Sequence, residues 1–381
     1  MPPILRVCHI GFNFFPGQGL TILFEFPRHQ AMQGLDVSVI APGRPGEPAD
    51  EHAEGINVHR IHMNSVGRYS FGRLVFLWKA AQWIRSRQFD LIHVYAFVGA
   101  GALPLLGLKR NRPIWLYDCQ TSAIKRPFLA LQNFLIWLES VPYDAITVLS
   151  EGIRNIVFGV RSRKVKATIP LGADFAHFAP REARRDLRER WRIPERGAVL
   201  TYCGTLDHNR HMHRLIEAFS FIAQEIPEAT LLMIGDGSAV AELKDQARKL
   251  GLTNRVVFTG FIPYERIPDY LSITDIALSY IVQTPYFEHQ PPTKTVEYLA
   301  QGLPVVATDT AGNREFIVDG ENGLLSDDTP RSFAATIVGL HNNPEKRKAL
   351  SMAARASVNK FDWANIVGTR VLPVYRELLQ D

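Results

Sequence analysis

The chain has 381 residues and a formal net charge of +5 at pH 7, with 46% hydrophobic and 21% charged residues. This is the composition of a soluble globular protein, and the length exceeds what one hydrophobic core ordinarily supports, so we expect two domains. The three cysteines lie far apart and show no Cys-x-x-Cys spacing, which argues against a disulfide framework and a zinc site and favours a reducing compartment.

The sequence predicts neither a signal peptide nor a membrane span. Arg6 interrupts the first apolar run, and the stretch 97–108 is too short and too rich in glycine to cross a bilayer. We therefore expect a cytoplasmic protein. The segment 68–87 mixes basic and aromatic residues, which suits peripheral contact with anionic lipid at the inner face of the cell membrane. The alternative is an ordinary amphipathic helix that packs its aromatic side chains inward.

The first half of the chain alternates short apolar runs with helical patterns. A helix is expected at 20–33, and the expected strands cover 5–11, 37–41, 57–61, 91–95, 114–117 and 145–149. Such alternation predicts a parallel sheet covered by helices. The aromatic stretch 128–137 lies between the last two of these strands and, with 68–87, permits a lipid-linked acceptor at a membrane face.

The pattern then restarts after a charged helical segment at 181–192. The expected strands of this second half cover 199–203, 230–234, 255–259, 276–280 and 305–308. Regular periodicity lapses around 170–180, where we place the linker. Two helix-covered sheets are therefore expected, one after the other.

Ligands of open parallel sheets bind beyond the carboxyl ends of the strands, and two glycine loops stand at such positions. In the first loop, Gly17-Gln18-Gly19 would let the backbone approach a phosphate, although a simple turn explains the pair about as well. It lacks the Gly-x-Gly-x-x-Gly spacing of dinucleotide sites, which argues against a nicotinamide enzyme.

The second loop, 204–214, is the stronger candidate. Gly204 and Thr205 follow an expected strand, and Arg210 stands near a helix start, where a guanidinium can clamp a diphosphate. Three histidines in the loop lack a second group of ligands, so we interpret them as solvated side chains and not as a metal site; they are His208, His211 and His213.

The segment 291–308 carries the most specific signal. Pro292 and Gly302 bound a short helix that Thr293 or Thr295 would cap. Lys294 at the helix start attracts phosphate, and Glu297 in the first turns suits the hydroxyl groups of a ribose or sugar. The pair therefore indicates a sugar nucleotide.

Two more turns follow expected strands in the second half. Asp236 is expected to cap a helix that begins near residue 238. Backbone groups at Phe261 and Ile262 would be free to contact a base edge, or they belong to a tight loop without a ligand.

These motifs occur in a fixed order through the chain. They are Ile169-Pro-Leu-Gly-Ala-Asp174, Tyr202-Cys-Gly-Thr-Leu206, Gly235-Asp-Gly237, Phe258-Thr-Gly-Phe-Ile-Pro263, Lys294-Thr-Val-Glu297 and Gly312-Asn-Arg-Glu315. The series resembles glycosyltransferase family 4, across nearly the whole chain. The resemblance implies an α/β fold of the GT-B type, with two Rossmann-like domains that face each other across a cleft. An acceptor domain would span 1–175 and be completed by the C-terminal helix 361–381, and a nucleotide-sugar domain would span 176–360.

The resemblance also implies roles for single residues. Glu297 matches the acid on the ribose hydroxyls, Arg210 and Lys294 match the cations at the diphosphate, and Phe261 with Ile262 matches the loop that contacts the base. The donor site would also include Gly204, Thr205, Glu288, His289, Gln290, Thr293 and Thr295. In the first domain, Gly17, Gln18 and Gly19 match the loop that faces the diphosphate, and His93 and Asp118 border the acceptor cleft as further catalytic candidates.

Three positions depart from the family pattern. His289 stands where many members have a second glutamate, and Glu288 is one residue out of register. Thr205 stands where many members have a second arginine, and the first domain lacks the frequent histidine near Asp118. These departures leave the donor sugar unassigned.

The resemblance implies a metal-independent hexosyl- or related transferase that moves a sugar, with retention, from a nucleotide-diphosphate sugar to a glycan, lipid-linked or small-molecule acceptor. The nucleotide sugar is a co-substrate and no cofactor is expected, nor is a nucleic-acid partner. Two alternatives stay open, because a fold alone does not decide a function. One is a non-catalytic subunit that binds nucleotide sugars, and the other is a sugar-nucleotide epimerase or an inverting transferase.

Overall fold

The computed structural model describes residues 4–15, 22–63, 71–107, 112–121 and 128–380. The chain divides into two compact units, each described by itself below. Unit 1 comprises Met1–Leu171 with Trp363–Asp381, and unit 2 comprises Gly172–Asp362.

Unit 1 is built on an eight-stranded sheet with the order β3-β4-β2-β1-β5-β6-β7-β8. Neighbouring strands are parallel except for β3 and β4, which are antiparallel. The strands are β1 (Arg6–Ile10), β2 (Asp36–Gly43), β3 (Asp50–Ala53), β4 (Ile56–His62), β5 (Leu91–Tyr95), β6 (Ile114–Cys119), β7 (Ala145–Val148) and β8 (Val165–Thr168). The connections contain α1 (Ile22–Met32), α2 (Phe71–Arg85), η1 (Ala100–Ala102), α3 (Leu103–Leu106), α4 (Leu129–Ser140), α5 (Glu151–Ile153) and η2 (Arg154–Phe158).

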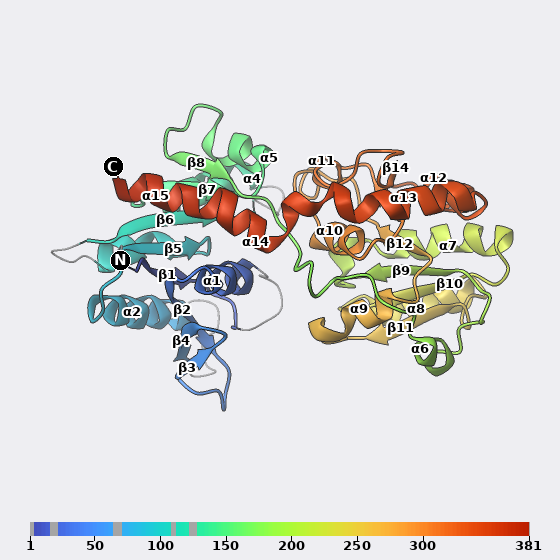
Figure 1. Cartoon of the computed structure of the whole chain (residues 1–381), viewed down its shortest axis with the longest axis horizontal. Coiled ribbons are helices and arrows are strands. Elements are labelled where there is room, and N and C mark those ends of the chain that lie inside the picture. Colours follow the sequence, from blue (N-terminus) through green and yellow to red (C-terminus); the bar gives the residue numbers. More distant parts are fainter. Residues whose placement is uncertain (1–3, 16–21, 64–70, 108–111, 122–127, 381) are drawn as a thin grey trace. The chain divides into compact units, whose positions relative to one another are not determined.

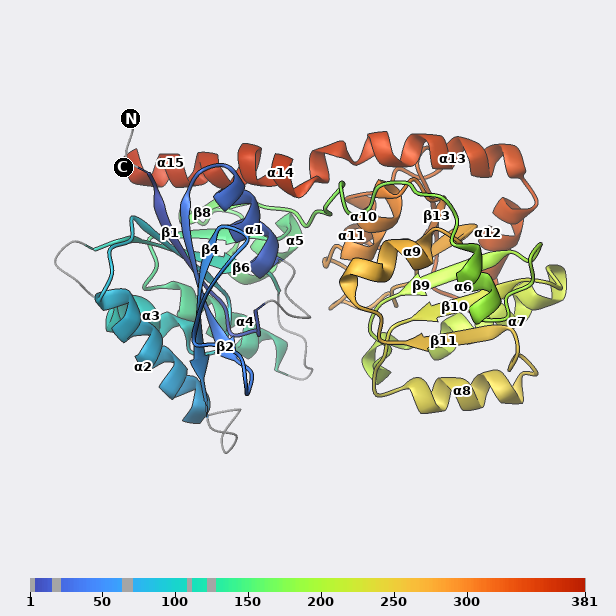
Figure 2. The same ribbon diagram turned by 60° about the horizontal axis from the view of Figure 1, so that its bottom comes forward.

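The C-terminal end of the chain belongs to unit 1, although it follows unit 2 in the sequence. It consists of α14 (Trp363–Ile366), η6 (Val367–Val371) and α15 (Leu372–Gln380). Trp363 and Tyr375 are fully buried in the same hydrophobic cluster as Val7 of β1 and Phe26 of α1. In Figures 1 and 2, α15 is the red helix beside the strands of unit 1.

Unit 2 is built on a six-stranded sheet that is parallel throughout, with the order β11-β10-β9-β12-β13-β14. The strands are β9 (Val199–Cys203), β10 (Thr230–Ile234), β11 (Val256–Gly260), β12 (Ile276–Ser279), β13 (Val305–Thr308) and β14 (Leu324–Ser326). The helices are α6 (Arg185–Arg190), η3 (His208–Arg210), α7 (His213–Glu225), α8 (Val240–Lys249), η4 (Tyr264–Arg266), α9 (Ile267–Leu271), α10 (Thr293–Ala300), α11 (Ala311–Arg314), α12 (Pro330–His341), α13 (Pro344–Ser357) and η5 (Asn359–Phe361).

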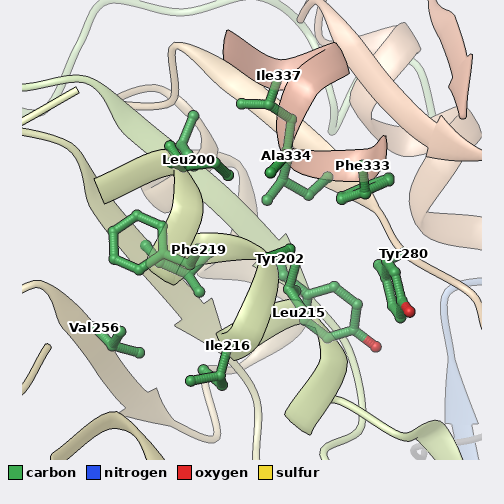
Figure 3. Packing of buried hydrophobic residues seen from close by; sticks show 14 of the residues in the cluster. Leu200, Tyr202, Leu215, Ile216, Phe219, Val256, Tyr280, Phe333, Ala334 and Ile337 are labelled. Atoms are coloured by element: carbon green, nitrogen blue, oxygen red, sulfur yellow. The ribbon is translucent and has the colours of Figure 1, made fainter. Parts of the chain in front are cut away.

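One large cluster of buried side chains forms the core of unit 2 and anchors β9. Leu200 and Tyr202 of β9 meet the apolar face of α7, and α12 packs against the same cluster (Figure 3). Apolar residues recur along α7 at helical spacing, so one face of this helix is buried while the other stays polar. This core holds the carboxyl end of β9 in place, and Gly204 follows directly from it.

The structure confirms the predicted α/β class, and four predicted strands, 91–95, 199–203, 230–234 and 305–308, coincide with β5, β9, β10 and β13. Three strands were missed, namely β3, β8 and β14. Asp-Glu-His-Ala in β3 has no apolar alternation because it is an exposed edge strand, and β8 and β14 are short strands at sheet edges. The helix expected at 181–192 is shorter and covers only α6.

The segment 68–87 forms α2 from Phe71 onward, and residues 68–70 lie outside the described part of the chain. Phe76 and Ile84 are buried in the core of unit 1, whereas Leu74 and Trp78 are exposed. Among the described residues, no helix is both long enough and apolar enough to span a bilayer.

Candidate functional site

The start of α10 holds Lys294, as predicted, but without the predicted cap. Pro292 is the N-cap residue, and it provides no side-chain hydrogen bond. The hydroxyl of Thr295 lies in the interior, 2.6 Å from the hydroxyl of Ser279 and 2.8 Å from the amide oxygen of Asn313. Thr295 is fully buried, so the prediction that it caps the helix is wrong, and a contact of this residue with a donor stays a prediction.

The ammonium nitrogen of Lys294 lies 3.9 Å from the centre of the Tyr202 ring. Tyr202 is buried near the end of β9, and the ring face attracts a cation. The lysine side chain continues past Gly204, where an added Cβ would lie 3.1 Å from the same nitrogen. The glycine therefore leaves room for the lysine at the end of the strand.

The electrostatic environment of Lys294 is unusual for a lysine. Burial, reinforced by the positive charge of Arg210, lowers the pKa of Lys294 to about 7, although Cys203 and Glu297 oppose this shift. A negatively charged ligand at this position would restore the ammonium form. The arrangement is therefore that of a cation site prepared for an anion.

Arg210 occupies the end of η3, in the loop that links β9 to α7. Its guanidinium carbon lies 4.8 Å from the centre of the buried Phe287 ring, in the segment that precedes α10. Two aromatic rings, Tyr202 and Phe287, thus support the two cations from β9 and from the loop before α10. The charge of Arg210 acts on Lys294, so the two cations lie near each other.

Close backbone packing holds the loop after β9. A Cβ at Gly235 would lie 2.1 Å from the carbonyl oxygen of Gly204, and a Cβ at Gly237 would lie 2.4 Å from the carbonyl carbon of Leu206. Asp207 also accepts hydrogen bonds from the amide and the hydroxyl of Ser238, at 2.8 and 2.9 Å. Glycine is therefore required where the two loops touch.

Asp236 does not have its predicted role. Its carboxylate accepts a hydrogen bond of 2.8 Å from the amide of Gly237, and α8 begins at Val240 with Ala239 as an N-cap residue that makes no side-chain bond. The aspartate stabilises the turn itself. It does not cap the helix, so the prediction from the sequence was wrong on this point.

Glu297 lies in the second turn of α10 and is partly buried. Its charge raises the pKa of Lys294 and contributes to the raised pKa of Cys203, which places the carboxylate near both groups. The next residue, Tyr298, fixes the helix to β9, because its hydroxyl accepts a hydrogen bond of 2.7 Å from the amide of Cys203.

The segment before α10 contains the residues expected to read the sugar. A carboxylate oxygen of Glu288 accepts a hydrogen bond of 2.9 Å from the amide of Ala311, at the start of α11. A Cβ at Gly312 would lie 2.4 Å from the carbonyl oxygen of Gln290, so the segment packs tightly on α11. His289, Gln290 and Thr293 are partly buried beside it. One oxygen of Glu288 is thus already used within the protein.

The remaining donor candidates of unit 2 lie at strand ends. Thr205 is exposed, directly after Gly204. Phe261 is 54% exposed and Ile262 partly buried, just after Gly260, which has a φ of +70°. The positive φ turns the chain at the end of β11 and leaves the Phe261 ring at the surface.

The histidines of the second loop do not gather into a metal site. His208 lies 3.4 Å from the carboxylate of Glu242, and the rings of His211 and His213 lie 5.7 Å apart. Within the described ranges, no group of three or more His, Cys, Asp or Glu side chains is arranged to hold a metal ion.

In unit 1, His93 and Asp118 lie close together but in the interior. A carboxylate oxygen of Asp118 is 3.3 Å from Nε2 of His93, whose Nδ1 is 2.6 Å from the hydroxyl of Tyr375 in α15. Both side chains are fully buried, and the hydroxyl of Thr147 donates to Asp118 at 2.9 Å. This geometry links the C-terminal helix to the sheet and presents neither side chain to an acceptor. Gly17, Gln18 and Gly19 lie outside the described residues.

Sequence reasoning missed the two aromatic residues whose rings contact the cations of the site. Tyr202 and Phe287 read as ordinary core aromatics, because nothing in the local pattern tells which ring will meet a cation. A signal did exist for Tyr202, since it stands two residues before Gly204 and its side chain points to the same face of β9 as that of Leu200.

Comparisons with known proteins agree with this geometry. The model of the glycosyl transferases group 1 matches residues 183–357, and the model of the glycosyl transferase 4-like domain matches residues 24–172. The Bacillus subtilis (strain 168) protein EpsD is 26% identical over 300 residues, which is 74% of this chain and 76% of EpsD. The phosphatidyl-myo-inositol mannosyltransferase of Mycolicibacterium smegmatis is 26% identical over 375 residues, which is 97% of this chain and 92% of that enzyme.

The fold has solved counterparts. The crystal structure of the Anabaena protein HepE in complex with UDP and glucose superposes with a TM-score of 0.79 at 20% identity, covering 98% of this chain and all of that one. At this identity the likeness establishes the fold only. Together with the two family models, it shows that the chain belongs to glycosyltransferase family 4 and has the GT-B fold.

Proposed function

We propose that this protein transfers a sugar, with retention of the anomeric configuration, from a nucleotide-diphosphate sugar to a lipid-linked or glycan acceptor. The observation that carries the proposal is the pair of cations at the start of α10, in which the charge of Arg210 helps to lower the pKa of Lys294 to about 7. A diphosphate that binds there relieves the repulsion between the cations, and Glu297 beside them suits ribose hydroxyls.

The chemistry follows from where charge develops. As the glycosidic bond to the phosphate breaks, the leaving diphosphate gains negative charge, and Lys294 and Arg210 stabilise it. In the family mechanism the acceptor attacks from the same face from which the leaving group departs. A phosphate oxygen takes the proton of the acceptor hydroxyl. No side chain of this protein then needs to act as a nucleophile, and we assign no chemical step to the buried His93 and Asp118.

The choice of substrates rests on the relatives. HepE was solved in complex with UDP and glucose, and the mycobacterial relative is a phosphatidyl-myo-inositol mannosyltransferase. We therefore propose a UDP- or GDP-sugar as the donor and a lipid that bears hydroxyl groups as the leading acceptor class. We also propose that no cofactor or metal takes part, because two protein cations serve the diphosphate.

Binding and transfer are tested separately. In a thermal-shift screen against UDP, GDP and their sugars, a ligand at a hundredfold its dissociation constant should add about 2.7 kcal/mol of stability. The best donor is then incubated with phosphatidylinositol, with a glycan acceptor and with water alone, in buffer with and without EDTA. We expect transfer in both buffers, and NMR of the product should show the anomeric configuration of the donor.

The rival functions predict other results. A non-catalytic subunit would bind a nucleotide sugar yet neither transfer nor hydrolyse it. An inverting transferase would yield the opposite anomer, and an epimerase would change the sugar while it remains on the nucleotide. Loss of activity in EDTA that added Mg²⁺ restores would overturn the proposal of metal independence.

A further inference from the structure

Helix α4 of unit 1 has its polarity reversed relative to an ordinary surface helix. Its side chains that face away from the protein are apolar, and seven of them, counting the residues that flank the helix, are between 42% and 63% exposed: Phe128, Leu131, Phe134, Leu135, Trp137, Leu138 and Val141. They include two large aromatic rings, Phe134 and Trp137, stacked with their centres 5.5 Å apart.

The face that α4 turns toward unit 1 is the more polar one. The carboxylate of Glu139 accepts hydrogen bonds from the amides of Gly99 and Gly101, at 2.7 and 2.5 Å. Ser140 is fully buried, and Ile136 is the side chain that packs against the core cluster. Because the carboxylate and the isoleucine fix the helix from within, the apolar face is held outward.

A continuous apolar face of this kind marks an interaction surface. Monomeric proteins expose single apolar residues routinely, but a contiguous patch along one helix is unusual unless a partner covers it. Along α4 itself the only charged side chain is Glu139, which is already bound to the two glycine amides. No carboxylate therefore stands on the outward face of the helix.

Basic residues follow the segment that packs against α4. The segment η2 packs against α4 and continues into Val160, which is 71% exposed, and then into Arg161 and Arg163, both exposed. Lys164 reaches the end of α4, where its ammonium donates hydrogen bonds of 2.7 and 2.9 Å to the carbonyl oxygens of Val141 and Tyr143. An apolar face with cations at one end matches the chemistry of an anionic lipid surface.

A second copy of this chain fits the face less well. A helix of 12 residues is about 18 Å long and presents a strip about 10 Å wide. Stable interfaces cover roughly 800 Å² on each partner, far more than such a strip offers. A lipid surface does not have this limit.

We propose that α4 is a membrane-docking surface, with Phe134, Trp137 and Leu138 inserted among the lipids and Arg161 and Arg163 at the anionic headgroups. This places the contact on α4 and not on 68–87, where, among the side chains of α2 whose exposure the structure describes, Leu74 and Trp78 are the exposed large apolar ones. The surface deepens the proposed function, because it would bring a lipid-linked acceptor to the enzyme, but the docking itself is measured without donor or acceptor.

The test uses vesicle flotation with the full chain. Wild-type protein is mixed with vesicles of phosphatidylcholine alone and with vesicles that also contain phosphatidylglycerol. The variant Phe134→Gln/Trp137→Gln/Leu138→Gln removes apolar side chains from α4, and Leu74→Gln/Trp78→Gln is the matched control on α2. We expect the α4 variant to bind anionic vesicles about tenfold more weakly or worse, and the α2 variant to bind like wild type.

A charge pair completes the design. Arg161→Gln/Arg163→Gln should weaken binding to anionic vesicles only, and added salt should have the same effect. Circular dichroism and the melting temperature show whether each variant is folded.

Failure of wild type to float with anionic vesicles overturns the proposal, and so does loss of binding in the α2 variant with retention in the α4 variant. An α4 variant that instead turns an oligomer into a monomer in sedimentation would assign the face to a second copy. Because no nucleotide is present, these outcomes do not depend on whether the chain transfers a sugar.

Discussion

The ammonium nitrogen of Lys294 lies 3.9 Å from the centre of the Tyr202 ring, so the end of β9 and the start of α10 meet through a cation and an aromatic face. The ring gives the lysine a fixed position without neutralising its charge. A salt bridge to a carboxylate would hold the lysine equally well but would cancel the charge that a diphosphate needs. The pair therefore keeps a cation in place and available.

Loss of either cation should reduce turnover strongly. We expect Lys294→Ala and Arg210→Ala each to lower kcat by about a hundredfold or more, as removal of one preorganised charge typically does. Steady-state kinetics with the best donor measures this. Lys360, which lies 5.1 Å from the centre of the Phe361 ring, provides a matched control, because Lys360→Ala also removes a lysine from an aromatic ring. Near-normal rates in both site variants would contradict the assignment of the donor site.

The ring beneath Lys294 can be tested apart from the lysine. Tyr202→Phe keeps the aromatic face and should retain most of the activity, whereas Tyr202→Leu should lower kcat/KM by about tenfold. A merely structural role predicts that both variants have a lower melting temperature, while the pH dependence of donor affinity stays unchanged. A positioning role predicts that Tyr202→Leu shifts the pH at which donor affinity declines. Equal behaviour of the two variants would exclude the ring as a support for the charge.

Donor binding should depend on pH through Lys294. Its pKa in the free protein is about 7, and a bound diphosphate favours the ammonium, so the pKa rises in the complex. Binding therefore takes up a proton above pH 7, and donor affinity should be highest at or below this pH and fall as the pH rises toward about 9. Calorimetry of a nucleotide sugar in two buffers of different ionisation enthalpy measures the proton uptake.

The control for this pH dependence is Lys294→Arg. Arginine stays protonated throughout the range, so the variant should bind the donor without taking up a proton at this site. Proton uptake of the same size in Lys294→Arg would show that another group is responsible.

Glu315, in the motif after β13, should lower stability at neutral and higher pH. Burial raises its pKa from the ordinary 4.5 to about 7. Between these values the native state binds more protons than the unfolded chain, so this group's contribution decreases as the pH rises from about 4.5 to about 7 and stays low above. Glu315→Gln should therefore increase the free energy of unfolding by about 1 kcal/mol at pH 8 and by less at pH 5.

Urea unfolding at the two pH values measures this difference. The exposed Glu321 supplies the control, since Glu321→Gln should leave the stability nearly the same at both. A stability gain at pH 5 equal to that at pH 8 would contradict the shifted titration.

The contact between the loop after β9 and the loop after β10 should not tolerate a side chain. Gly235 has a φ of +136°, and a Cβ there would lie 2.1 Å from the carbonyl oxygen of Gly204, so Gly235→Ala should cost about 2 kcal/mol or more and weaken donor binding. Thermal unfolding and donor titration measure both effects. Gly339 in α12 has nothing within 4 Å of an added Cβ, so Gly339→Ala should be neutral or stabilise by up to about 1 kcal/mol. Normal donor binding by a folded Gly235→Ala variant would show that this contact does not shape the site.

The local signals in the sequence were sufficient to predict the alternation of strands and helices in both units. Buried parallel strands such as β9, β10 and β13 are continuous apolar runs bounded by glycine or proline, so their position depends on few neighbours. The same logic placed Lys294 and Glu297 on a helix that follows a buried strand. Edge strands such as β3 were missed, because an exposed strand carries no apolar period.

Only the tertiary structure decided which polar residues are available. His93, Asp118 and Thr295 were reasonable site candidates by position, but packing against α15, β7 and α11 encloses them, and sequence alone does not show which partners meet in the interior. The aromatic stretch 128–137 permitted a membrane face in the sequence, and only the fold shows which of its side chains on α4 face outward. The sequence determined the class of protein and the two cations proposed for the phosphate because these depend on local order along the chain. Burial, ring contacts and exposed faces depend on residues far apart in the sequence, and the tertiary structure alone brings those together.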